Sequence, residues 1–369
     1  MADSGSDLGL RCRRCGTTGA ADLRTWRCPS CRGPLEAPPT TILTEELAGE
    51  GLWRYAPWLP VRTRVSLGEP TTPLVDLNWG GRRVIVKNEG ALPTGSFKDR
   101  GAAVLVSWLR DRGAAAVVED SSGNAGAALA AYCARAGIRC EIYVPSDAPG
   151  AKVAQLRAYG ATPILVDGPR SDATAAAVRA ARAGSVYASH AWNPVYLAGT
   201  QTFAFELWEQ LGRDVPDVLI VPVGGGALLL GAHLGFAALR RGGLIERVPR
   251  LVAAQAAACA PLARAFDDGL PDPVPVVPSA SVADGIQIGR PVRGREVLAA
   301  IRASGGSAVA LDDRAIIAAH GAAALQGLLV ERTSATALAA LELPGVVEPG
   351  EGVVVAATGH GLKTPPAVS

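Results

Sequence analysis

The chain has 369 residues, of which 49% are hydrophobic and 19% are charged. This is long enough for two domains and too apolar for a disordered chain. The 36 basic and 34 acidic residues give a net charge of +2, so binding of nucleic acid by bulk electrostatics is disfavoured. The N-terminus is acidic and polar and long apolar runs are lacking, so we expect a cytoplasmic protein with no membrane partner.

Two cysteine pairs lie close to the N-terminus. Cys12 and Cys15 form one C-x-x-C pair, Cys28 and Cys31 form the other, and twelve residues separate the pairs. This spacing is typical of four thiolates around Zn²⁺, and four protein ligands leave no open position for catalysis. We therefore predict a structural zinc ribbon behind a flexible tail within residues 1–36, with an iron site or two disulfides as the alternatives.

From Arg82 onward, short β-branched runs alternate with Ala-rich helical stretches, which predicts βαβ units and the α/β fold class. The expected strands are Arg83 to Asn88, Ala116 to Glu119, Cys140 to Val144, Thr162 to Val166, Val218 to Val223, Leu251 to Ala254 and Gly352 to Ala356. Helices are expected to begin near Gly95, Asn124, Gly150, Asp172, Leu197, Gly226, Asp312 and Ser334.

The stretch P-T-G-S-F-K-D-R-G, residues 93–101, is the most informative motif. Gly95 and Ser96 are expected to turn the chain into a helix with Lys98 in its first turn. The positive end of the helix dipole favours a neutral amine there, which is the form that reacts with a carbonyl group. The alternative is a solvated surface lysine beside Asp99 and Arg100.

Three further motifs follow predicted strands. Ser121-Ser122-Gly123-Asn124 opens a helix, where backbone N–H groups and small hydroxyls suit a carboxylate. The run Gly224-Gly225-Gly226-Ala227 lacks the Lys-Ser/Thr of a nucleotide P-loop but can surround a phosphate. Thr358 follows the last strand and can present a neutral hydroxyl to a ring nitrogen. All of these turns lie at the carboxyl ends of parallel strands, where open α/β sheets bind ligands.

On these motifs, together with G-I-Q-I-G-R-P-V at 285–292 and T-G-H-G-L-K at 358–363, the chain resembles the fold type II pyridoxal-phosphate (PLP) enzymes. Within them it is most similar to the threonine synthase family. The resemblance implies two three-layer α/β domains with parallel-rich sheets behind the ribbon. The large PLP domain would hold residues 37–95 and 205–369, the small mobile domain residues 96–204, and two chains would form a homodimer.

The resemblance also implies roles for individual residues. Lys98 would be the catalytic Schiff-base lysine and proton shuttle, and Phe97 would stack beside the ring. Asn124 would contact the ring hydroxyl, and Thr358 would meet the ring nitrogen. The phosphate would lie on Gly224, Gly225, Gly226 and Ala227, and the substrate carboxylate on Ser121, Ser122, Gly123 and Asn124.

Two segments depart from the family pattern. Threonine synthases usually read T-G-N-T-S where this chain has Ser122 to Gly126, so two hydroxyls are missing. They also carry Arg and Lys where this chain has Tyr196 and Gln201, and those two charges are candidates for holding a substrate phosphate. His190 precedes the second segment, near the expected substrate entrance.

The resemblance implies elimination or replacement at Cβ or Cγ of a small amino acid. The reaction would be conversion of O-phosphohomoserine to threonine and phosphate, or that of a relative with another substrate. The alternatives are a serine/threonine dehydratase-type ammonia-lyase, a β-replacement synthase, and a PLP-binding protein without catalysis.

Overall fold

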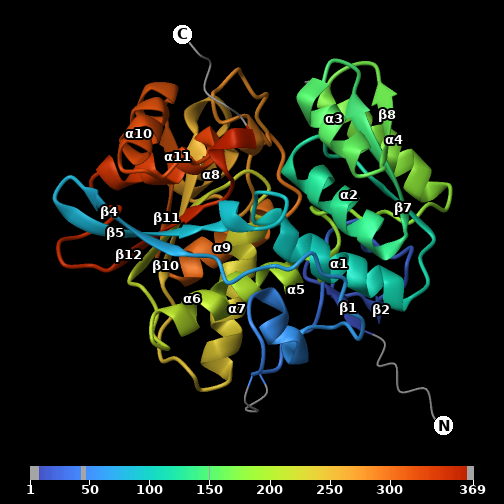
Figure 1. Cartoon of the computed structure of the whole chain (residues 1–369), viewed down its shortest axis with the longest axis horizontal. Helices are drawn as coiled ribbons and strands as arrows, with labels where there is room; N and C mark the ends of the chain where they lie inside the picture. Colours follow the sequence, from blue (N-terminus) through green and yellow to red (C-terminus); the bar gives the residue numbers. More distant parts are fainter. Residues whose placement is uncertain (1–7, 43–46, 149, 364–369) are drawn as a thin grey trace. The chain divides into compact units, whose positions relative to one another are not determined.

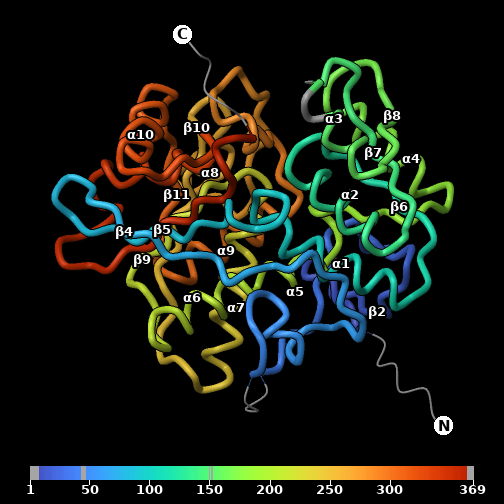
Figure 2. The backbone as a smooth tube through the Cα atoms, in the orientation of Figure 1, coloured from blue at the N-terminus to red at the C-terminus, as the bar shows by residue number. Residues whose placement is uncertain are grey.

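The computed structural model describes residues 8–42, 47–148 and 150–363 (Figures 1 and 2). Contacts divide the chain into two compact units. The first holds Met1–Thr40, Ala56–Gly68 and Lys98–Gly199, and the second holds Thr41–Tyr55, Glu69–Phe97 and Thr200–Ser369. No helix within the described ranges is long and apolar enough to cross a membrane.

The cysteine module is a small antiparallel sheet within the first unit. Its strands are β1 (Gly9–Cys12), β2 (Thr18–Ala20) and β3 (Leu35–Glu36), in the order β2-β1-β3. Trp26 anchors the module, because its ring meets the rings of Tyr187 and Trp192 edge to face at centroid distances of 5.1 and 5.2 Å. The module therefore shares a small apolar core with the rest of its unit.

The body of the first unit is a parallel sheet in the order β6-β7-β8, with α-helices packed against it. The strands are β6 (Ala116–Glu119), β7 (Arg139–Pro145) and β8 (Thr162–Val166). The helices are α1 (Lys98–Asp111), α2 (Asn124–Ala136), α3 (Gly150–Ala158), α4 (Arg170–Arg182) and α5 (Pro194–Thr200), whose last residue falls in the second unit. A parallel bridge between Val118 and Tyr187 adds a short edge segment beside β6.

The second unit contains a six-stranded sheet in the order β11-β10-β9-β12-β5-β4. Its strands are β4 (Leu74–Trp79), β5 (Arg82–Asn88), β9 (Val218–Pro222), β10 (Arg250–Ala256), β11 (Ser307–Leu311) and β12 (Val353–Ala357). Neighbouring strands are parallel except for the β4–β5 hairpin. The helices are α6 (Thr202–Gln210), α7 (Ala227–Arg241), α8 (Pro261–Asp267), α9 (Gly294–Ala303), α10 (Asp313–Leu325) and α11 (Arg332–Ala339).

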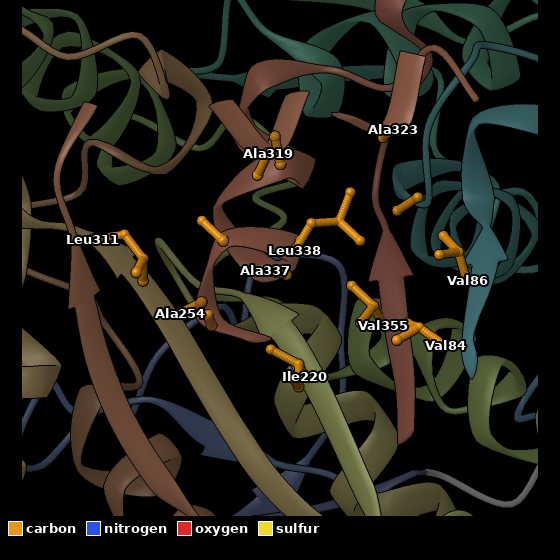
Figure 3. Close-up of a cluster of buried hydrophobic side chains, with 14 of the residues drawn as sticks. Val84, Val86, Ile220, Ala254, Leu311, Ala319, Ala323, Ala337, Leu338 and Val355 are labelled. Carbon is orange, nitrogen blue, oxygen red and sulfur yellow. The ribbon is translucent and has the colours of Figure 1, made fainter. Parts of the chain in front are cut away.

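The central strands of this sheet are buried on both faces, as expected where helices cover both sides of a parallel sheet. In Figure 1, α10 and α11 lie on one face and α6, α7 and α9 on the other. On the first face, Leu338 of α11 packs against Ile220 of β9 and Val355 of β12 (Figure 3). This core holds β9 and β12 in place, and the carboxyl ends of these strands lead into Gly224 and Thr358.

The predicted α/β fold class is confirmed, and all seven expected strands are present with ends shifted by at most two residues. Five elements were not predicted from the sequence, namely β4, β11, α6, α8 and α9. Ser307–Leu311 is short and follows a Gly-Gly pair, and α6 begins two residues after α5 ends, so neither showed an independent pattern.

Candidate functional site

Lys98 is the first residue of α1 and is partly buried, as the P-T-G-S-F-K motif predicts. The chain has only four lysines: Lys87, Lys98, Lys152 and Lys363. The Lys87 amine is fully buried, 2.7 Å from the Glu206 carboxylate, and the Lys363 amine donates to the Thr94 carbonyl at 2.6 Å. The Lys152 side chain lies outside the described part of the chain. The position of Lys98 at the start of α1 and its partial burial suit covalent chemistry.

Tyr196 of α5 holds the first turn of α1. Its hydroxyl donates to the Lys98 carbonyl at 3.0 Å. A Cβ at Gly101 would lie only 2.3 Å from the Tyr196 ring, so only glycine lets the ring pack this closely. Burial, and then the Asp99 charge, raise the Tyr196 pKa well above its usual range. Where the family pattern has an arginine, this chain thus has the neutral phenol of Tyr196. Its hydroxyl is hydrogen-bonded to the backbone carbonyl of Lys98.

The predicted carboxylate loop joins β6 to α2. β6 ends at Glu119, and α2 begins at Asn124 with Gly123 as its N-cap. No side chain caps the N-terminal end of α2, so the first backbone N–H groups of this 13-residue helix point toward the loop. Ser121 accepts a hydrogen bond from the Gly123 N–H at 3.3 Å. These features suit a carboxylate, while Ala125 supplies no hydroxyl.

The glycine run lies between β9 and α7 in the second unit. Gly226 is the N-cap of α7, with φ at 84° and no side-chain cap. A Cβ at Gly224 would lie 2.8 Å from the Ile286 Cα, whereas one at Gly225 would meet nothing within 4 Å. The three glycines thus put no side chain of their own at the start of a 15-residue helix, where backbone N–H groups fit a phosphate group.

Thr358 follows β12, and its hydroxyl lies 3.0 Å from the Ser334 hydroxyl of α11. Ser334 also accepts hydrogen bonds from the Thr358 and Gly359 N–H groups, at 2.9 and 3.1 Å. A hydroxyl has two acceptor lone pairs and one donor. Both lone pairs of Ser334 are used, so its hydrogen goes to Thr358, and the Thr358 hydrogen can be donated elsewhere. That donor fits a neutral pyridine nitrogen.

Phe97 stands next to Thr358 in the second unit. Its N–H donates to the Thr358 carbonyl at 3.0 Å. The preceding residues pair with the same segment, because Ser96 bridges Gly359 and the His360 N–H donates to the Gly95 carbonyl at 2.9 Å. The chain that leads into Lys98 is therefore held against the residue predicted to meet the ring nitrogen.

The four ribbon cysteines are brought together. Their sulfurs all lie within 4.8 Å of one another, with Cys12 3.4 Å from Cys31 and Cys15 3.5 Å from Cys28. Tetrahedral zinc with Zn–S bonds of about 2.3 Å separates its sulfurs by about 3.8 Å. The donor set fits zinc.

Lys98 and the Ser121 to Asn124 loop belong to the first unit, and Phe97, Gly224 to Ala227 and Thr358 belong to the second. Their roles toward a ligand remain predictions. Sequence reasoning missed two further positions. Ser334 was expected at the start of a late helix packed beside the cofactor, with no role of its own, and Glu119 only at the end of a strand. Consecutive acids closing an otherwise apolar strand were the available signal for Glu119.

The family model described as "Pyridoxal-phosphate dependent enzyme" matches residues 65–359. Threonine synthase of Methanocaldococcus jannaschii is 37% identical over 97% of this chain and 93% of its own. Threonine synthase of Synechocystis sp. is 36% identical over 84% of this chain and 82% of its own.

Solved structures show the same fold. A threonine deaminase from T.th. matches with a TM-score of 0.70 and 25% identity, over 86% of this chain and 97% of its own. Maize serine racemase matches with a TM-score of 0.69 and 25% identity, over 79% of this chain and 88% of its own. With the matched family model and these relatives, the chain belongs to the pyridoxal-phosphate-dependent enzymes and, within them, to the threonine synthase-like group of lyases.

Proposed function

We propose that this chain binds PLP through Lys98 and catalyses elimination or replacement at Cβ or Cγ of a small amino acid. The observation that carries the proposal is the hydroxyl pair, in which Ser334 fixes Thr358 as a donor. A hydroxyl at the ring nitrogen leaves the pyridine unprotonated. PLP would supply an electron sink next to Cα, and an unprotonated ring makes this sink weaker, which favours elimination and replacement over transamination.

Each candidate residue then has a defined task. The backbone amides of Gly224, Gly225, Gly226 and Ala227 would bind the phosphate, and Phe97 and Asn124 would orient the ring. The Ser121 to Asn124 loop would bind the substrate carboxylate. The Lys98 amine would remove the Cα proton, and the Tyr196 hydrogen bond to the Lys98 carbonyl keeps that first helical turn in place.

The threonine synthase reaction on O-phosphohomoserine is the first candidate, because the relatives that cover most of the chain carry that name. A second candidate is ammonia-lyase activity on a β-hydroxy amino acid. It is favoured by Tyr196 and Gln201, which are buried and uncharged where the family pattern has two cations. A phosphate-binding site that lacks its cationic side chains binds a phosphate poorly.

The test uses the holoprotein with O-phosphohomoserine, assayed for phosphate and threonine, and with serine and threonine, assayed for 2-keto acids. Turnover of any of these supports the proposal. Lys98→Ala is expected to lose the absorbance of the bound cofactor together with turnover, whereas Lys363→Arg, which keeps a donor for the Thr94 carbonyl, is expected to keep both. Unchanged absorbance and turnover in Lys98→Ala would refute the site.

We further propose that the four cysteines bind one structural Zn²⁺ ion. The sulfur distances and the two C-x-x-C pairs support this assignment. Elemental analysis should give about one zinc per chain, falling to a small fraction in Cys28→Ser. Iron in place of zinc, or full metal content in the variant, would contradict the assignment.

A homodimer is also proposed from the family resemblance, and a cytoplasmic location from the lack of long apolar runs in the sequence. The family resemblance also implies a functional division into a ribbon, a small domain of residues 96–204 and a large domain of residues 37–95 and 205–369. Sedimentation, cell fractionation and limited proteolysis test these three points.

A further inference from the structure

The segment from Val186 to His190 runs beside β6 as a parallel edge. The Val118 N–H donates to the Val186 carbonyl at 2.8 Å, and the Ala188 N–H donates to the Val118 carbonyl at 3.0 Å. Continuing in this register, the segment brings His190 to the carboxyl end of β6. This is the strand end that leads directly into the predicted carboxylate loop.

At this strand end, His190 and Glu119 form a close pair. The His190 Nδ1 lies 2.6 Å from one Glu119 carboxylate oxygen, and the His190 N–H donates to the same oxygen at 3.3 Å. The carboxylate is 1% exposed and the imidazole 18% exposed. Because Nδ1 carries the hydrogen bond to Glu119, the other ring nitrogen, Nε2, is the atom available for proton transfer. Nε2 has no hydrogen-bond partner among the described residues.

The second carboxylate oxygen of Glu119 is buried and has no hydrogen-bond partner within the described ranges. Such an oxygen costs folding free energy, and pairs of this kind concentrate at functional sites. Burial raises the Glu119 pKa, but the charge and hydrogen bonds of His190 outweigh it and hold this pKa below its usual range. Glu119 is therefore a charged carboxylate that orients His190.

The neighbours of the pair include several ionisable groups. Asp120 follows Glu119 and accepts hydrogen bonds from the Tyr187 and Thr174 hydroxyls, at 2.7 and 2.6 Å. Burial, and then the Glu119 charge, raise the Asp120 pKa. Arg170 of α4 adds positive charge near Glu119, and the neutral Tyr196 ring lies edge-on to His190 at a centroid distance of 6.1 Å.

Tyr196 links the pair to Lys98. Its ring lies edge-on to His190, and its hydroxyl donates a hydrogen bond to the Lys98 carbonyl. Where the family pattern has an arginine suited to a phosphate, this unit thus places an oriented imidazole beside a neutral phenol. Phosphate departs without a proton donor, whereas a hydroxyl leaves readily only when it is protonated.

We propose that His190, oriented by Glu119, is the acid that protonates a departing hydroxyl, so that the substrates of this enzyme are β-hydroxy amino acids. The inference rests on the proposed function and specifies its leaving group. Lys98 takes the Cα proton, and the electrons of that C–H bond form a second bond between Cα and Cβ. The Cβ–O bond breaks with its electron pair on oxygen, and His190 Nε2 transfers its proton to that oxygen. Water leaves, and solvent returns a proton to the imidazole.

Two probe substrates with different leaving groups test the role of His190. L-Serine loses a hydroxyl, which needs a proton, while β-chloro-L-alanine loses chloride, which does not. His190→Gln is expected to lower kcat/KM for L-serine by about 100-fold, and that for β-chloro-L-alanine by less than about threefold. The control His320→Gln, whose ring bonds the Val330 carbonyl from α10, should leave both rates unchanged.

Glu119→Gln tests the positioning role and serves if His190→Gln does not fold. It keeps the shape of the side chain but removes the charge that orients the imidazole. We expect the L-serine rate to fall, the β-chloro-L-alanine rate to hold, and the pH dependence of the L-serine reaction to change relative to the wild type. An equal loss on both substrates, with an unchanged pH profile, would overturn the inference.

The outcomes separate the two proposals. A wild-type enzyme that processes neither probe nor O-phosphohomoserine refutes the proposed function itself. One that processes β-chloro-L-alanine but loses equal activity on both probes in His190→Gln keeps the function and refutes the role of His190. Phosphate release from O-phosphohomoserine without turnover of L-serine or L-threonine also keeps the function and refutes the hydroxyl leaving group.

Discussion

Each unit holds a close pair of ionisable side chains, and the two pairs differ in how fully they are hydrogen-bonded. In the second unit, the Lys87 amine contacts the Glu206 carboxylate at 2.7 Å, the Thr72 hydroxyl at 2.6 Å and the Gln210 amide oxygen at 2.7 Å. In the first unit, the Glu119 carboxylate has His190 on one oxygen and no partner on the other among the described residues.

This difference separates a structural role from a functional one. A buried ion is tolerated when its partners compensate for lost hydration, as they do for Lys87 between β5 and α6. The incomplete Glu119 pair adds less to stability and keeps an imidazole nitrogen available. We expect substitutions at the first pair to affect folding, and substitutions at the second to affect catalysis.

The largest stability loss is expected for Lys87→Met. The substitution leaves Glu206 charged and buried without its cation, so the free energy of unfolding should fall by about 3–5 kcal/mol. Urea unfolding measures this change. The double variant Lys87→Met/Glu206→Leu removes both charges and should recover much of the loss. A Lys87→Met protein as stable as the wild type would show that the pair is not a structural network.

Ser334→Ala should have an intermediate effect. It removes the acceptor for the Thr358 and Gly359 N–H groups and should cost about 2 kcal/mol in the free energy of unfolding. The matched control is Ser307→Ala, since the buried Ser307 hydroxyl has no hydrogen-bond partner in the described part of the chain. Equal losses in the two variants would contradict the assignment of Ser334 as the group that orders Thr358.

Glu119→Gln should change stability least, by less than about 1 kcal/mol at neutral pH. Because the folded-state pKa of Glu119 lies below its unfolded value, its contribution is present above the unfolded pKa and is lost as the pH falls through the folded one. The variant should therefore lose less stability than the wild type on acidification. Urea midpoints measured across the acidic range check this, and a loss at neutral pH as large as that of Lys87→Met would erase the contrast between the pairs.

The sequence was most informative where chemistry and local structure coincide. Lys98 and Asn124 begin helices because glycine and small polar residues precede them, and β-branched runs identified the strands that lead to Gly224 and Thr358. The buried pairs could not be predicted from the sequence, because their residues are far apart in the chain and come together only in the folded structure. His190 is 71 residues from Glu119, Ser334 is 24 from Thr358, and Glu206 is 119 from Lys87.

The departures at Tyr196 and Gln201 were visible in the sequence, but their consequence was not. Loss of two cations predicted weak binding of a phosphate. Packing of Tyr196 against Gly101, and its edge-on contact with His190, depend on how α5 returns to α1. The spacing of residues in the sequence does not predict this packing, so the role we propose for His190 follows only from the folded structure.

The most direct test of the central claim is to reduce the holoprotein with sodium borohydride, which fixes PLP to the amine that holds it, and to locate the modified peptide by mass spectrometry. With four lysines in the chain, the assignment is unambiguous. We predict modification of about one residue per chain, at Lys98. Modification at Lys87, Lys152 or Lys363, or none in a protein that retains PLP, would contradict the account.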